Sequence, residues 1–170
     1  MDRVLLLRRV LILCCHFARN LAYYKAAWDG NHHIRNSDFW KTTSGNSYDI
    51  CVLEWCKLLG EAKGEHHWSQ IVSDKLAFEA ALYPHLGIDA ATFEQYRLAM
   101  RAYRDQFVAH LDLEPTADLP RLDNARASVW FYHAYVVNKE IDAAGIGRLP
   151  KDLEGHYSEK FDEARKIYDS

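Results

Sequence analysis

The stretch VLLLRRVLILCCHFARNLAYYKAAW, residues 4–28, decides the fold class of this protein. Its apolar side chains recur around most of the circumference of a helix, and neither glycine nor proline interrupts them before Gly30. Arg8 and Arg9 split the apolar run, which leaves it far short of the roughly twenty apolar residues that span a bilayer. The stretch therefore predicts a long, largely buried first helix and no membrane anchor.

Helical patterns and helix-stop residues continue along the chain. After the polar loop DGNHHIRN, Ser37 and Asp38 favour the start of a second helix, in which TTSGNS is expected to cause a break or a kink. Pro115 and Pro120 mark LDLEPTADLP as a linker. No alternating run long enough for a sheet appears. The sequence predicts an all-α, up-and-down antiparallel bundle of about five to six helices, over residues 4–28, 37–59, 68–82, 90–110, 121–143 and 151–167.

The composition fits one folded domain without a general attraction to polyanions. With 170 residues and 49% hydrophobic residues, the chain is long enough for one core, so we expect a single domain over residues 1–170, with its core in about 1–145 and a C-terminal helix at about 151–168. The formal charge of −3 provides no global field towards RNA or an anionic membrane. Any site for a polyanion must therefore be local.

Four cysteines, Cys14, Cys15, Cys51 and Cys56, form one vicinal pair and one pair with four residues between its members. Neither spacing is typical of a zinc site or of a disulfide framework. We expect these thiols to be reduced and the protein to be cytoplasmic.

The segment RDQFVAH, residues 104–110, closes the predicted helix 90–110. At about 100° per residue, an apolar arc of Phe93, Tyr96, Met100, Tyr103 and Phe107 faces the core. Arg97, Arg101 and Arg104 form a basic row along one edge of that arc, and His110 falls at the other edge. On an ideal helix Arg104 and His110 are about 120° apart and about 9 Å apart along the axis, so they do not converge within one helix.

The residues alone leave two interpretations of the Arg104 and His110 pair open, a functional site and a structural role. In the structural role, Arg104 pairs with a carboxylate and His110 caps the last carbonyls of its own helix. The bare Arg-to-His spacing is weak support for a site, because Arg9 with His16 and Arg126 with His133 also fit it.

The longer string RLAMRAYRDQFVAHLD resembles the motif of the HEPN superfamily (higher eukaryotes and prokaryotes nucleotide-binding), in particular its abortive-infection-like subgroup. Arg104 matches the family's arginine, Asp105 its polar position and His110 its histidine. The all-α prediction extends the similarity loosely over residues 1–145. The resemblance implies a metal-independent endoribonuclease without cofactors, of the toxin–antitoxin or abortive-infection type, that works as a homodimer on RNA and has a cognate antitoxin in some systems.

In that interpretation His110 transfers a proton, Arg104 binds the scissile phosphate, and Asp105 orients one of them or the motif of the partner copy. Imidazole and guanidinium suit these tasks, because RNA cleavage by the 2′-hydroxyl needs proton transfer and positive charge at the phosphate. Arg97 and Arg101 would extend the phosphate track, and Tyr103 would stack on a base unless it is a core residue. The alternative is a non-catalytic RNA-binding or protein-interaction module of the same fold.

Two further clusters have simpler interpretations. The pairs His32-His33 and His66-His67 have no metal-binding spacing, so we expect exposed loop histidines and no metal site. A helical metalloenzyme built on these pairs is the third functional possibility. The run VWFYHAYVV, residues 129–137, is expected to be a core helix that buries His133, with a dimer seam or a ligand groove as the alternative.

Overall fold

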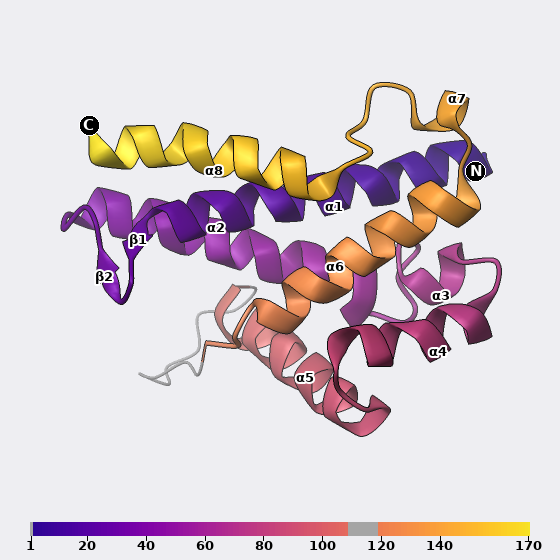
Figure 1. Ribbon diagram of the computed structural model, residues 1–170. Helices are drawn as coiled ribbons and strands as arrows, with labels where there is room; N and C mark the ends of the chain where they lie inside the picture. Colours follow the sequence, from indigo (N-terminus) through magenta and orange to yellow (C-terminus); the bar gives the residue numbers. More distant parts are fainter. Residues whose placement is uncertain (1, 109–118) are drawn as a thin grey trace.

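A computed structural model of the chain describes residues 2–108 and 119–170, without the side chains of residues 107 and 108. These residues form eight α-helices, three of which continue into π-helical turns, and one two-stranded ribbon (Figure 1). The all-α prediction is confirmed. The helices are α1 (Arg3–Ala26), α2 (Asp38–Trp55), α3 (Trp68–Ile71), α4 (Lys75–Leu86), α5 (Ala90–Tyr103), α6 (Asp123–Tyr135), α7 (Ala143–Ile146) and α8 (Leu153–Asp169).

Helix α1 is the central element, as its apolar circumference predicts. The Asp2 carboxylate accepts a hydrogen bond from the amide of Val4 and so begins the helix. Helix α1 packs lengthwise against α2 and α8 and is crossed by α6 (Figure 1). Its buried side chains therefore face several neighbours, which explains why apolar residues occupy most of its circumference.

The prediction of antiparallel neighbours is only partly right. Helices α1 and α2 run in opposite directions, whereas α1 and α8 run the same way, from the end with the N-terminus to the end with the C-terminus (Figure 1). Since α6 returns to the N-terminal end, the segment that carries α7 only needs to connect α6 to the start of α8.

Helix α2 runs without a break through the TTSGNS segment, contrary to our expectation. The hydroxyls of Thr43, Ser44 and Ser47 donate to backbone carbonyls three or four residues earlier in the helix, at distances of 2.8 Å, 3.1 Å and 3.2 Å. These side chains therefore form hydrogen bonds within the helix, and do not offer its backbone a non-helical alternative.

Three other expectations about the elements are corrected. Residues 68–82 are not one helix, because Val72 is extended and Asp74 caps a new helix, α4, by accepting from the amide of Ala77. The predicted helix 121–143 is formed by α6 and a π-helical turn at Val136–Glu140 and ends early, because Ile141 is extended; α7 is a separate short helix. The polar loop after α1 contains the ribbon of β1 (Trp28–Asp29) and β2 (His32–His33), which turns at Gly30 with a φ of 56°.

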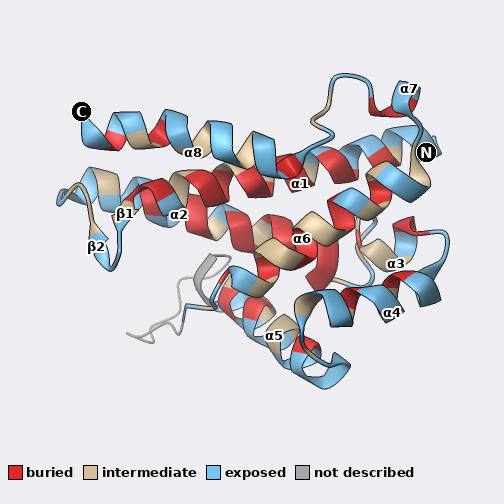
Figure 2. Cartoon of the chain, in the orientation of Figure 1, coloured by how far each residue is buried: buried red, intermediate tan, exposed pale blue. Residues whose placement is uncertain are grey.

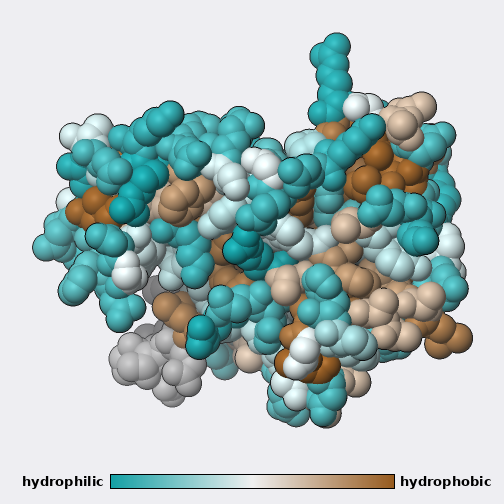
Figure 3. All heavy atoms as spheres, in the orientation of Figure 1, coloured by the Kyte–Doolittle hydropathy of each residue, from teal (hydrophilic) through white to brown (hydrophobic). Residues whose placement is uncertain are grey.

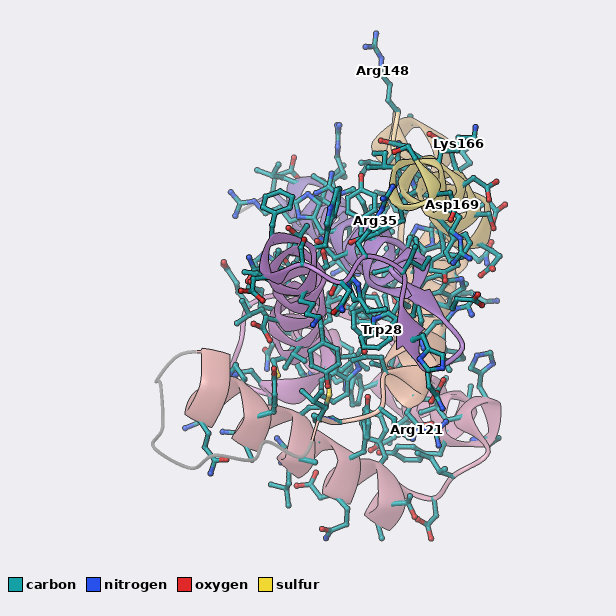
Figure 4. All side chains as sticks on the ribbon, turned by 90° about the vertical axis from the view of Figure 1, so that its left-hand side faces the viewer. Trp28, Arg35, Arg121, Arg148, Lys166 and Asp169 are labelled. Atoms are coloured by element: carbon teal, nitrogen blue, oxygen red, sulfur yellow. The ribbon has the colours of Figure 1, made fainter. Side chains whose placement is uncertain are left out.

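The ribbon is attached to the C-terminal end of α8. The Arg35 guanidinium donates to the carbonyl of Tyr168 at 2.7 Å, and Arg165 donates to the carbonyl of Trp28 at 3.0 Å. Figure 4 shows Arg35 next to the end of α8 that carries Asp169. The last helix is therefore fixed at its C-terminal end as well as along α1.

The core lies where α1, α2, α5 and α6 meet, and Figure 2 shows their buried faces directed inward. Phe78 of α4 is fully buried, and four aromatic rings from α3 and α6 lie within 5.5 Å of its centroid. At the end of α2 and in the π-helical turn that follows it, Trp55 and Leu58 are buried, whereas Ile50 of α2 is 37% exposed.

Most of the face in Figure 3 is hydrophilic, with apolar side chains gathered at the end near the N-terminus and α7. Val4, Leu5 and Ile12 of α1 are 41%, 46% and 37% exposed. No helix within the described parts of the chain combines the length and the apolar character needed to cross a membrane.

Candidate functional site

The RDQFVAH segment begins where the α-helical geometry of α5 ends. Asp89 caps this helix by accepting from the amide of Thr92 at 2.7 Å, and the α-helix ends at Tyr103. Arg104 opens a π-helical turn, Arg104–Val108. Such turns are rare and occur frequently at functional sites. The angle expected between Arg104 and His110 assumed an ideal α-helix, and His110 lies outside the described residues.

Arg104 is held by carboxylates from two parts of the chain. Its Nη1 donates to Glu61 Oε2 at 2.8 Å, and its Nη2 lies 2.7 Å from Asp105 Oδ1. Partial burial by itself lowers the pKa of the guanidinium, but the hydrogen bonds to Glu61 and Asp105 outweigh burial and raise this pKa above its ordinary value. Arg104 is therefore charged and fixed in position, with 20% of its side chain exposed.

The basic row along α5 is formed, and each of its guanidinium groups faces a carboxylate. Arg101 Nη2 lies 3.8 Å from Glu61 Oε1. Arg97 binds both carboxylate oxygens of Glu94, at 2.7 Å and 2.6 Å, and donates to the carbonyl of Gly60 at 2.9 Å. An RNA phosphate would have to compete with these carboxylates, which weakens the role of Arg97 and Arg101 as a phosphate track.

Tyr103 is a core residue, which was the alternative to base stacking. It is 9% exposed, its hydroxyl donates to Asp49 Oδ1 at 2.7 Å, and its ring lies 5.4 Å from that of Tyr48. Burial raises the pKa of its phenol. Its ring forms part of the wall of an aromatic pocket of about 370 Å³ that Trp28 also lines. A base stacked on Tyr103 would have to displace these core contacts.

A pocket of about 490 Å³ adjoins Arg104. Apolar side chains from α1 and α2 and charged or polar residues from the end of α2, the following loop and the end of α5 line it: Leu13, Leu53, Cys56, Lys57, Glu61, Gly64, Glu65, His66 and Arg104. Its volume lies in the range of sites that hold small molecules. The pocket therefore places Arg104 beside a space large enough for a nucleotide.

The two histidine pairs are not simply exposed. His32 is exposed, but His33 contacts the carbonyl of Arg35 at 2.6 Å and the hydroxyl of Ser44 at 3.0 Å. His67 is only 4% exposed, and burial lowers its pKa. Among the described residues no group of three His, Cys, Asp or Glu side chains has the geometry to hold a metal ion.

The other predicted features have mixed outcomes. His110 and the greater part of the predicted linker lie outside the described residues, as does the side chain of Phe107.

His133 is buried, as expected, with its Nε2 3.1 Å from the carbonyl of Pro150. The run VWFYHAYVV lies in a core helix, but its buried face is Val129, Tyr132, His133 and Val136, whereas Ala134 is exposed. All four cysteines are buried free thiols.

Sequence reasoning missed the role of Glu61 and the placement of His66. Glu61 lies 43 residues before Arg104 in the chain. Its hydrogen bond to Arg104 lowers the pKa of its own carboxyl, so the pair is fully ionised near neutral pH. No periodicity or local motif links a loop carboxylate to a helix end so distant in sequence.

No protein-family model, curated protein or solved structure matches this chain.

Proposed function

We propose that this chain is a metal-independent endoribonuclease that cleaves RNA by attack of the 2′-hydroxyl on the adjacent phosphate. The observation that carries the proposal is the position of Arg104. It lies at a π-helical turn beside a nucleotide-sized pocket and is held there by Glu61 and Asp105. A fixed, charged guanidinium at the edge of a pocket is suited to binding a phosphate and stabilising the charge that develops on it.

In this proposal the residues of the RDQFVAH segment have separate tasks. Arg104 binds the scissile phosphate, His110 transfers a proton, and Asp105 orients Arg104, to which it is hydrogen-bonded at 2.8 Å. A histidine is the side chain whose ordinary pKa best suits proton transfer near neutral pH. Pairing of two copies as a homodimer would bring a second Arg104 and a second His110 to the same cleft.

The carboxylates around Arg104 limit which RNA can bind. Because Glu61 and Asp105 offset much of the positive charge, the site has little attraction for duplex RNA or for polyanions in general. The net charge of −3 acts in the same direction. We therefore expect selective action on a particular RNA, as a toxin or antiviral effector of the cytoplasm, with an antitoxin as the natural means of control.

The test is cleavage of a mixed single-stranded RNA pool by the purified full-length protein in excess EDTA. Wild type is compared with Arg104→Ala, His110→Ala and Arg121→Ala. Arg121 is the matched control, because its side chain is 89% exposed and pairs with Asp123 at 3.1 Å. We expect wild type and Arg121→Ala to leave 2′,3′-cyclic phosphate ends, and the other two variants to lose cleavage.

The second candidate is a non-catalytic RNA-binding or protein-interaction module. The carboxylate partners of Arg97, Arg101 and Arg104 favour its protein-interaction form, because they compete with phosphate for these guanidinium groups. Anisotropy of a fluorescent single-stranded RNA separates the two. Binding that survives His110→Ala, with intact RNA for every variant, would replace the ribonuclease by the binding module. Cleavage that EDTA abolishes would refute the metal-independent mechanism.

A further inference from the structure

RNA cleavage by the 2′-hydroxyl requires two proton transfers. A base takes the 2′-hydroxyl proton as the 2′-oxygen bonds to phosphorus, and an acid protonates the 5′-oxygen as its bond to phosphorus breaks. The products are a 2′,3′-cyclic phosphate and a 5′-hydroxyl, and no oxidant or metal is consumed. The proposed function names one histidine in each chain, His110, and obtains a second through the partner copy of a homodimer. A second proton-transfer group within the same chain would supply both transfers without the partner's histidine.

The pocket beside Arg104 contains a suitable group. Among the described residues, His66 is the histidine that lines this pocket. It belongs to the loop between the π-helical turn Cys56–Gly60 and α3, whereas Arg104 lies at the end of α5. The two side chains have similar exposure, 19% for His66 and 20% for Arg104. Two segments far apart in the sequence thus bring an imidazole and a guanidinium to one pocket.

His67 and the backbone fix the loop that carries His66. His67 Nδ1 accepts from the amide of Ser69 at 3.2 Å, so its Nε2 carries the proton and donates to the carbonyl of Leu59 at 3.2 Å. The hydroxyl of Tyr132 donates to the carbonyl of His66 at 3.3 Å. Adjacent residues point in different directions, so a buried His67 leaves His66 directed to the pocket. A loop anchored in this way holds a reacting group in a defined place.

We propose that His66 is a second proton-transfer residue and acts on the phosphate that Arg104 binds. This inference rests on the ribonuclease proposal. The charged groups that line the pocket with His66 are Lys57, Glu61, Glu65 and Arg104, and His66 Nε2 lies 3.8 Å from Glu65 Oε1. The lining therefore places both signs of charge around the imidazole.

The lining also indicates the kind of RNA. Leu13, Leu53 and Cys56 contribute apolar atoms, and the charged side chains Arg104 and His66 line the same space. An unpaired base with its phosphate fits that division, whereas a base within a duplex remains stacked and cannot enter. The substrate class is therefore single-stranded RNA with an accessible nucleotide on the 5′ side of the cleaved bond.

The first experiment measures the cleavage rate as a function of pH for wild type, His66→Gln, His66→Ala and His32→Ala. His32 is the matched control, because it is exposed and belongs to the other histidine pair. We expect both His66 variants to lower kcat by about 10²-fold or more and to remove one limb of the pH profile. Their thermal unfolding should match that of wild type. Rates and profiles equal to those of His32→Ala would overturn the assignment.

The second experiment needs no cleavage and separates the two proposals. Uridine 3′-monophosphate is added to the full-length protein, and the ring proton resonances of His66, assigned with His66→Gln, are followed by NMR. We expect them to shift in wild type and in His32→Ala, and to stay unchanged in Arg104→Ala. If wild type cleaves RNA but the resonances do not move, the His66 inference is wrong and the ribonuclease stands. If no RNA is cleaved but they move, the ribonuclease is wrong and His66 keeps only a nucleotide-binding role.

Discussion

Replacing Phe78 by alanine should strongly destabilise the fold. Phe78 is fully buried, and the centroids of four rings lie 4.9 to 5.5 Å from its own: Trp68, Phe131, Tyr132 and Tyr135. A buried Phe→Ala change costs about 3–5 kcal/mol, from lost transfer free energy and from the cavity that remains. Because rings from α3 and α6 surround Phe78 and cannot all move inward, we expect the upper half of that range.

Urea unfolding followed by tryptophan fluorescence measures this change, since Trp68 stacks on Phe78 and reports on the cluster. For a chain of this size, a loss of about 4 kcal/mol corresponds to a decrease in Tm of roughly 8–16 °C. Phe39→Ala is the control, because Phe39 is 69% exposed and its loss should change stability by about 0.5 kcal/mol or less. A Phe78→Ala loss below about 1 kcal/mol would refute the assignment of this cluster as a core.

Three further predictions concern charge and protonation. Arg104→Ala should lower the free energy of unfolding by about 1 kcal/mol or less, because its partner Glu61 is 39% exposed and regains water. A much larger loss, measured by urea unfolding, would favour a structural role for Arg104. Burial raises the pKa of the Cys15 and Cys56 thiols to about 11, so Ellman's reagent at pH 8 should react slowly with native protein and rapidly after denaturation. Burial lowers the pKa of His133 to about 4, whereas the same ring in the unfolded chain has a pKa of about 6.5. As the pH decreases between these values, the unfolded chain takes up a proton that the folded protein does not. The free energy of unfolding should therefore fall by about 3 kcal/mol from about pH 6.5 to about pH 4. His133→Gln should show a smaller decrease, and equal pH dependence would contradict the buried neutral ring.

The helices were predictable because their signals are local. The uninterrupted apolar stretch of α1, the Asp89 cap of α5 and the stop at Gly87 each depend on residues a few positions apart. The errors arose where local signals conflict. The TTSGNS segment contains residues that favour turns, yet its hydroxyls bond to the helix backbone and α2 continues through it.

The sequence by itself determined the all-α class, the central place of α1 and the row of arginines on α5, because helical periodicity fixes which residues share a face. Tertiary structure decided what those arginines contact. The partner of Arg104 is Glu61, 43 residues earlier, and the pocket they share needs α1, α2 and the His66 loop to meet the end of α5. The tertiary structure also decided that His67 is buried and that His66 is not, since only packing sets which of two adjacent side chains is buried. Contacts between elements far apart in the chain depend on how the helices pack, and no local pattern encodes that packing.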